Sequence, residues 1–238
     1  MRNVIERRAA AWDSLLAQVP GSSCARLSAL TAVPAYVSQV VGDDAGGHDW
    51  WHAERVARTA LEIARHEGAD AELCVIAAAL HDVVDYKVVA DETAAADELR
   101  GWLRTYGLPE PDIQQIVSIA LTLSFNGGGR PAMASLEGAV VQDADRLDSL
   151  GAIGLARTLA FGGTIGRPLH EPGLSPRLEM TAQEYRSYVS TSINHIRERL
   201  LVVRERLNTT YARDLAEERE AFIIVFLERF EDEWHGRR

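Results

Sequence analysis

Helical periodicity runs through almost all of this 238-residue chain, whereas the apolar–polar alternation typical of a strand is nearly absent. Residues 3–18 carry apolar side chains at helical spacing. A second helix is predicted to begin near Asp49 and to end at Gly68, and Asp70 is placed to cap a third. That third helix runs to the pair His81–Asp82. The chain is therefore predicted to be all-α, with negligible strand content.

The rest of the chain is also predicted to be helical, apart from segments rich in Gly and Pro. Further helices are expected over residues 91–106, 111–123, about 134–160, and from a capping box at Thr181 and Glu184 to about 207. The buried stripe of the last helix is predicted to be Leu215, Phe222, Ile223, Phe226, Phe230 and Trp234. Residues 162–180 are expected to form a long loop. With no repeat or linker visible, a single domain over 1–238 is predicted, with its core motifs in 48–160 and its C-terminal helices in 181–235 packing on that core.

Composition excludes several classes of protein. A net charge of −10 with no evident basic face argues against nucleic-acid binding, because phosphates would be repelled. Two cysteines are too few for a disulfide framework. The longest apolar runs are far shorter than a membrane span, and the charged N-terminus does not resemble a secretory signal. A cytoplasmic protein with no membrane partner is expected.

Charged residues interrupt apolar helices in three places. The stretch ALHDVVDYK (79–87) puts His81, Asp82 and Asp85 at the end of an apolar run, where they are costly to dehydrate unless something binds them. His52 lies in the first turn of the preceding predicted helix, and Asp145 lies in the apolar stretch VVQDADRLDSLGAIG. The hypothesis that accounts for this pattern is a bound metal ion.

The order and helical placement of these residues, with the ADRL context, resemble the H…HD…D signature of the HD-domain metal-dependent phosphohydrolase superfamily. The likeness to its branch of small bacterial hydrolases runs from about residue 20 to the C-terminus. It implies a helical bundle with a metal site in a central cleft, where His52, His81, Asp82 and Asp145 bind one divalent cation. Mn²⁺ is favoured for such a ligand set, with Mg²⁺, Co²⁺, Ni²⁺, Fe²⁺ or Zn²⁺ as alternatives. An internal ion pair beside surface histidines is the alternative to a metal.

Residues 83–144 contain no histidine, whereas HD proteins with two or three metals carry extra histidines there. A single-metal phosphohydrolase is therefore favoured over the dinuclear phosphodiesterases and the di-iron oxygenases of the superfamily.

The resemblance also implies roles for nearby polar residues. Asp85, one helical turn after His81, would manage the proton of the attacking water beside the catalytic ligand Asp82. Its alternative role is to accept an N–H bond or to pair with Lys87. The candidates for substrate phosphate contacts are Arg55, Lys87, Asn126 in the SFNGGGR segment, and Arg146. Arg146 has an alternative role as a partner of Asp143 or Asp148.

The predicted activity is hydrolysis of a phosphoester or phosphoanhydride, with a nucleotide as the substrate class and nucleoside triphosphate pyrophosphohydrolysis as the favoured form. The candidates to stack on a base are Trp50, Trp51, Tyr86 and Phe125, and core packing explains the tryptophans equally well. His48 is predicted to support the metal ligands from behind or to be structural. His195 is predicted to be a core histidine, with reaching the cleft together with Asn194 as its alternative. A catalytically silent sensor of metal or nucleotide and an oxygenase of HD type remain as alternatives. A homodimer through the apolar terminal helix is left open.

Overall fold

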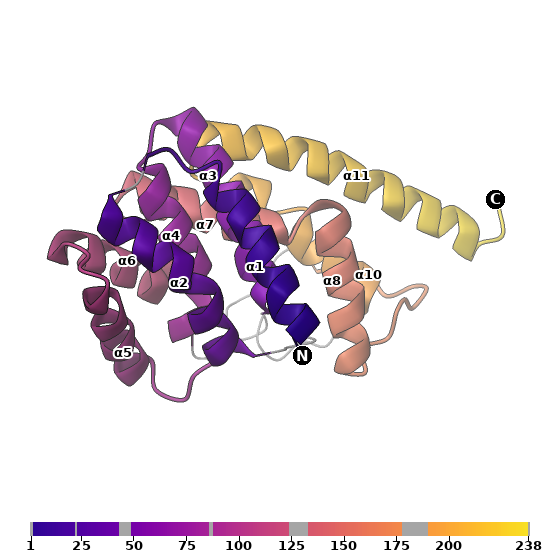
Figure 1. Cartoon of the computed structure of the whole chain (residues 1–238). Helices are drawn as coiled ribbons and strands as arrows, with labels where there is room; N and C mark the ends of the chain where they lie inside the picture. The colour runs from indigo at the N-terminus through magenta and orange to yellow at the C-terminus, as the bar shows by residue number, and fades with distance from the viewer. Residues whose placement is uncertain are drawn as a thin grey trace. The chain divides into compact units, whose positions relative to one another are not determined.

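The structure is a computed structural model, and most of the residues it describes are helical (Figure 1). No strand occurs in those ranges, so the all-α prediction is confirmed. None of the helices there combines the length and the apolar character needed to cross a membrane. The described residues are 2–21, 23–42, 49–85, 88–123, 133–177 and 190–237.

The described residues group into two compact units, and the boundary falls inside one helix, after Asp145. The single domain expected over residues 1–238 stays a prediction. The first unit holds α1 (Arg2–Leu16), α2 (Cys24–Val41), α3 (Trp50–Glu67), α4 (Ala71–Leu80), the 3₁₀ turn η1 (His81–Val84), α5 (Glu92–Thr105), α6 (Glu110–Leu123) and α7 (Leu136–Asp148) up to the boundary. The second holds α8 (Gly151–Thr164), α10 (Ser192–His195), the π-helix η2 (Ile196–Leu200), η3 (Arg204–Arg206) and α11 (Thr210–Trp234).

Helix α4 forms the centre of the first unit. Every residue from Glu72 to Leu80 is buried, and α2, α3 and α6 all pack against this helix. Trp12 of α1 and Trp50 of α3 meet edge to face, with ring centroids 5.5 Å apart, and the Trp12 indole donates to the Leu30 carbonyl of α2 at 2.7 Å. The central position of α4 means that the polar residues at its C-terminal end are also held inside the unit.

Caps fix the ends of α3 and α4 where the sequence predicts them. Asp49 accepts a hydrogen bond from the His52 N–H and begins α3, while Asp70 accepts from the Leu73 N–H and begins α4. Gly68 ends α3 with a φ of +74°, in the left-handed region that glycine adopts without strain. These predicted boundaries are confirmed.

Several sequence-based expectations need correction or addition. Helix α2 is an addition to the predicted helices; Ser23 caps it, and Pro34 lies inside it. The single helix expected over 134–160 is two helices, because Leu150 is extended and Gly151 has a φ of +66°. Since α8 continues to Thr164, the expected loop begins only after that residue.

The long helix expected to reach residue 207 is also wrong over its described part. Thr191 starts a new helix by accepting from the Asn194 N–H, and this helix widens into the π-helix η2 before it ends. The turn η3 follows separately. The capping box at Thr181 and Glu184 lies outside the described residues.

The buried stripe of α11 differs from the predicted one. Phe222 and Trp234 are 50% and 44% exposed, and the fully buried positions are Ala212, Ala216, Ile223 and Leu227. The predicted stripe consists of large apolar side chains, whereas the covered side of this helix includes two alanines, which allow close approach of neighbouring elements. Of the predicted stripe, only Ile223 is fully buried.

Candidate metal centre

His52 enters the site from the first turn of α3. Because the Asp49 carboxylate accepts from the His52 N–H at 2.9 Å, the cap that begins the helix also fixes the backbone of the histidine. The imidazole is buried. The sequence predicts the cap, but it gives no sign that the capped N–H belongs to a site residue.

His81 and Asp82 enter from the end of α4, where the helix tightens into the 3₁₀ turn η1. The His81 ring places Nδ1 2.6 Å from the Ala78 carbonyl, and since a carbonyl only accepts, Nδ1 carries the hydrogen. In the neutral imidazole the lone pair is therefore on Nε2, which faces His52, Asp82 and Asp145.

Asp145 completes the group from α7, and its side chain is 32% exposed. His52 Nε2 lies 3.3 Å from His81 Nε2, 3.5 Å from Asp82 Oδ2 and 3.4 Å from Asp145 Oδ1. His81 Nε2 lies 3.2 Å from Asp82 Oδ1 and 3.7 Å from Asp145 Oδ1. Three segments that are distant in sequence thus bring two imidazoles and two carboxylates together.

These separations fit a single ion. Ligand atoms bonded to one cation at about 2.0–2.2 Å stand roughly 3.0–3.4 Å apart in tetrahedral or octahedral geometry. His52, His81 and Asp82 form a candidate metal site, with their ligand atoms all within 4.8 Å of one another. Asp145 adds a carboxylate oxygen against both imidazoles.

The electrostatics of the cluster favour a positive charge at the same place. Burial by itself lowers the pKa of His81, but the carboxylates of Asp82 and Asp145 outweigh it and raise this pKa from 6.5 to about 10. Burial by itself raises the pKa of Asp145, yet the hydrogen bond and charge from His52, with the charge of His81, hold this pKa below its usual value. The negative charge that favours a proton on the His81 imidazole would equally favour a divalent cation between the four groups, which would take the place of that proton on Nε2.

Asp85 is buried just past the HD pair, but not as the sequence suggests. The helix ends before it, because η1 tightens and Asp85 itself is extended, with its N–H bonded to the Asp82 carbonyl. It therefore does not stand one α-helical turn beyond His81. Its proton-transfer role stays a prediction.

The predicted phosphate contacts are only partly within the described residues. Arg55 lies on α3, three residues after His52, and is partly exposed. Arg146 donates a hydrogen bond to the Arg206 carbonyl, a structural contact within the second unit. Lys87 and Asn126 lie outside the described residues, and the substrate role of all four stays a prediction.

The carboxylates near Asp145 have structural surroundings of their own. Asp148 pairs with Arg157 at 2.6 Å, which gives this aspartate a partner other than the Arg146 that the sequence suggested. Asp143 is fully buried, a feature that the sequence analysis missed. The sequence feature that could have predicted this burial is the apolar context of VVQDADRL, because Val140, Val141, Ala144 and Leu147 around Asp143 are buried.

Among the aromatic candidates for base stacking, Trp50 belongs to the core, where it contacts Trp12. Trp51 is partly exposed. Tyr86 and Phe125 lie outside the described residues, as does His48. For Trp50, core packing is therefore the better explanation.

Proteins of known sequence or structure resemble this chain over most of its length. The HD domain family matches residues 50–150. The uncharacterized protein YpgQ of Bacillus subtilis (strain 168) is 32% identical over 206 residues, which are 86% of this chain and 93% of YpgQ. The crystal structure of YpgQ in complex with ADP matches with a TM-score of 0.71 and 31% identity, covering 88% of this chain and 96% of that chain. The crystal structure of an HD-superfamily hydrolase from Bacillus thuringiensis matches with a TM-score of 0.70 and 34% identity, covering 89% of this chain and 98% of that chain.

Proposed function

Because the chain belongs to the HD-domain superfamily of hydrolases, we propose that it is a metal-dependent phosphohydrolase that acts on a nucleotide. The reaction is hydrolysis of a phosphoester or phosphoanhydride bond, with pyrophosphohydrolysis of nucleoside triphosphates as the favoured form. The observation that carries the proposal is that His52, His81 and Asp82 meet at separations that fit one ion, with an Asp145 carboxylate oxygen 3.4 and 3.7 Å from the two imidazoles.

The proposed ligands are His52, His81, Asp82 and Asp145, and Mn²⁺ is the favoured cation. When bound, such a cation supplies Lewis acidity at a phosphoryl oxygen and makes water easier to ionise. The hydrogen bond to the Ala78 carbonyl keeps the His81 ring oriented with Nε2 inward, so its donor atom is in place before any ligand arrives.

The chain's other residues are assigned to proton transfer and binding. The Asp85 carboxylate is buried next to the HD turn, so a proton accepted from the attacking water would stay inside the site. Arg55, Lys87, Asn126 and Arg146 are the proposed phosphate contacts. The nucleotide assignment draws on YpgQ, whose crystal structure contains ADP.

The proposal is tested by turnover. The purified chain with Mn²⁺ should release phosphate or pyrophosphate from a panel of nucleoside mono-, di- and triphosphates. His81→Ala should lower the rate by at least about 100-fold, because it removes a ligand whose Nε2 lies within 3.7 Å of the other three residues. His66→Ala is the matched control, since His66 is an exposed histidine on α3 and should leave the rate unchanged.

Three outcomes would contradict the proposal. Equal rates for His81→Ala and the unmodified chain would place the activity elsewhere. Nucleotide binding without turnover by the Mn²⁺-loaded chain would indicate a sensor. Bound iron with consumption of O₂ would indicate an oxygenase.

A further inference from the structure

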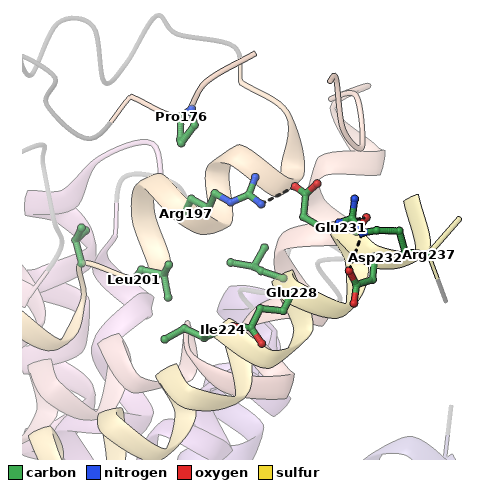
Figure 2. Close-up of a pocket in the computed structure, with 10 residues that line it drawn as sticks. Pro176, Arg197, Leu201, Ile224, Glu228, Glu231, Asp232 and Arg237 are labelled. Atoms are coloured by element: carbon green, nitrogen blue, oxygen red, sulfur yellow. Dashed lines mark hydrogen bonds and ion pairs between the residues drawn. The ribbon is translucent and has the colours of Figure 1, made fainter. Parts of the chain in front are cut away.

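We propose that the second unit contains a separate binding groove for a small amphiphilic cation, with an apolar body and an ammonium head. The groove encloses about 870 Å³ and lies along the C-terminal half of α11 (Figure 2). It is lined by Pro176, Arg197, Leu201, Val202, Ile224, Leu227, Glu228, Glu231, Asp232 and Arg237. None of the proposed metal ligands is among them, so this inference is independent of the proposed function.

The shape of the groove suits a small molecule. Its volume lies in the range of roughly 300–1,000 Å³ that is typical of ligand pockets. One side is formed by α11 and the other by η2 with the turn that follows it, while Pro176 faces them from the loop after α8 (Figure 2). Leu201, Val202, Ile224 and Leu227 give it an apolar lining. An alkyl body would bury its surface against these four side chains.

The charges around the lining determine the sign of the ligand. Arg197 pairs with Glu231 at 2.7 Å, and Arg237 pairs with Asp232 at 3.0 Å (Figure 2). The hydrogen bond from Arg197 also holds the pKa of Glu231 below its usual range, so both members of that pair are ionised. Both arginines of the lining therefore already have a carboxylate partner.

Glu228 is the one charged residue of the lining that belongs to neither of these two ion pairs. Among the residues the structure describes, its carboxylate has no hydrogen bond and no ion pair, and it lies one turn along α11 from Ile224. The lining carries two positive and three negative residues, and the excess negative charge is the one next to the apolar wall. A ligand that places an ammonium group at Glu228 and an alkyl chain over Ile224 and Leu201 satisfies the charge and the apolar surface together.

The test compares three ligands of one chain length with the full-length protein. Octylammonium, octanol and octanoate are titrated by calorimetry, and the residues that respond are located by NMR chemical shifts. Octylammonium should bind most tightly and octanoate most weakly. Glu228→Gln should weaken octylammonium binding by about 5-fold and leave octanol unchanged, because only the ammonium loses its partner.

Two further variants separate the site from a general surface effect. Glu218→Gln removes another exposed carboxylate of α11 outside the groove and should change nothing. Ile224→Ser should weaken octylammonium and octanol alike, and since Ile224 is 43% exposed this variant should fold. Octanoate binding as tight as octylammonium, an unchanged affinity in Glu228→Gln, or no response at the lining residues would overturn the proposal.

Discussion

The two cysteines of this chain lie in opposite environments. Cys24 is exposed at the start of α2, whereas Cys74 is buried in α4. Burial, with the nearby charges of Glu137 and Asp70, raises the pKa of the Cys74 thiol far above its ordinary value, so almost no reactive thiolate forms there. One thiol per native chain should therefore react with iodoacetamide at pH 8, as counted by mass spectrometry.

The variant Cys24→Ser identifies which thiol reacts. It should take up no label when native and one label in urea. Labelling of native Cys24→Ser at the rate of an exposed thiol would show that α4 is not held in the core as described.

His195 makes the stability of the chain sensitive to acid. Burial, together with the positive charges of Arg167 and Arg199, lowers its pKa from 6.5 to about 4. The folded chain therefore holds this imidazole neutral, and its contribution is fully present above pH 6.5 and is lost as the pH falls toward 4. The free energy of unfolding should fall in this window by at most about 1.4 kcal/mol per pH unit from this one site.

The matched variant is His195→Gln, compared by urea unfolding at pH 7.5 and pH 5.0. The stability difference between the two chains should shift in favour of the variant at the lower pH, since glutamine takes up no proton. A difference that is independent of pH would contradict the assignment.

At the scale of single residues, the side chains that the sequence singled out lie together in the structure, while their role as the ligands of one metal ion stays a prediction. The spacing of His52, His81, Asp82 and Asp145, read with the family resemblance, was enough to select four side chains that meet. The place of Asp85 could not be predicted, because it depends on η1 tightening into a 3₁₀ turn. Nor does any sequence pattern reveal that the Ala78 carbonyl orients an imidazole.

At the scale of elements, α8 contains two adjacent glycines with different surroundings. A Cβ on Gly162 would come within 2.4 Å of the Ser192 hydroxyl on α10, whereas a Cβ on Gly163 would meet open space. Gly162→Ala should therefore destabilise the chain by about 1–3 kcal/mol. Gly163→Ala should be neutral or stabilise it by up to about 1 kcal/mol, because alanine is the better helix former. Urea unfolding measures both.

A substitution at Ser192 tests whether the close contact with its hydroxyl causes the loss of stability in Gly162→Ala. Ser192→Ala removes the hydroxyl and leaves its own Cβ 3.6 Å from the added methyl group, an ordinary contact. The double variant Gly162→Ala with Ser192→Ala should recover most of the loss. Additive losses would mean that the close approach of α8 and α10 is not the cause.

Helix boundaries could be predicted where a local capping residue sets them. Which side chains of a helix are buried could not be predicted in the same way. Asp49, Gly68 and Asp70 act through their own backbone neighbourhood, so the sequence alone carries the information. The buried stripe of α11 depends on which elements cover the helix, and here Ala212 and Ala216 are covered while Phe222 is not. The break after α7 depends on one left-handed glycine, Gly151, within an otherwise helical pattern.

At the scale of the whole molecule, one arginine links three helices of the first unit. Arg26 on α2 contacts Asp70 at 2.8 Å and Glu72 at 3.1 Å at the start of α4, and Asp112 on α6 at 2.9 Å. Burial alone lowers the pKa of Arg26, but the three carboxylates raise it above its ordinary value. Arg26→Met should destabilise the chain by about 3 kcal/mol in urea unfolding, because it leaves partly buried carboxylates facing one another.

Arg100→Met is the control for Arg26→Met. Arg100 pairs with Asp97 on α5 at 2.7 Å, but the Asp97 side chain is solvent-exposed, so its loss should cost no more than about 0.5 kcal/mol. Equal effects of the two substitutions would show that the Arg26 cluster contributes no more than an ordinary surface pair.

The group that orients His81 belongs to the main chain. Since the acceptor is the carbonyl of Ala78, no exchange of a side chain can delete it. Side-chain substitutions near the imidazole therefore leave this hydrogen bond in place. A mutation that unwinds the last turn of α4 would remove it. A substitution at Ala78 that keeps the last turn of α4 helical therefore keeps the acceptor of the His81 ring in place.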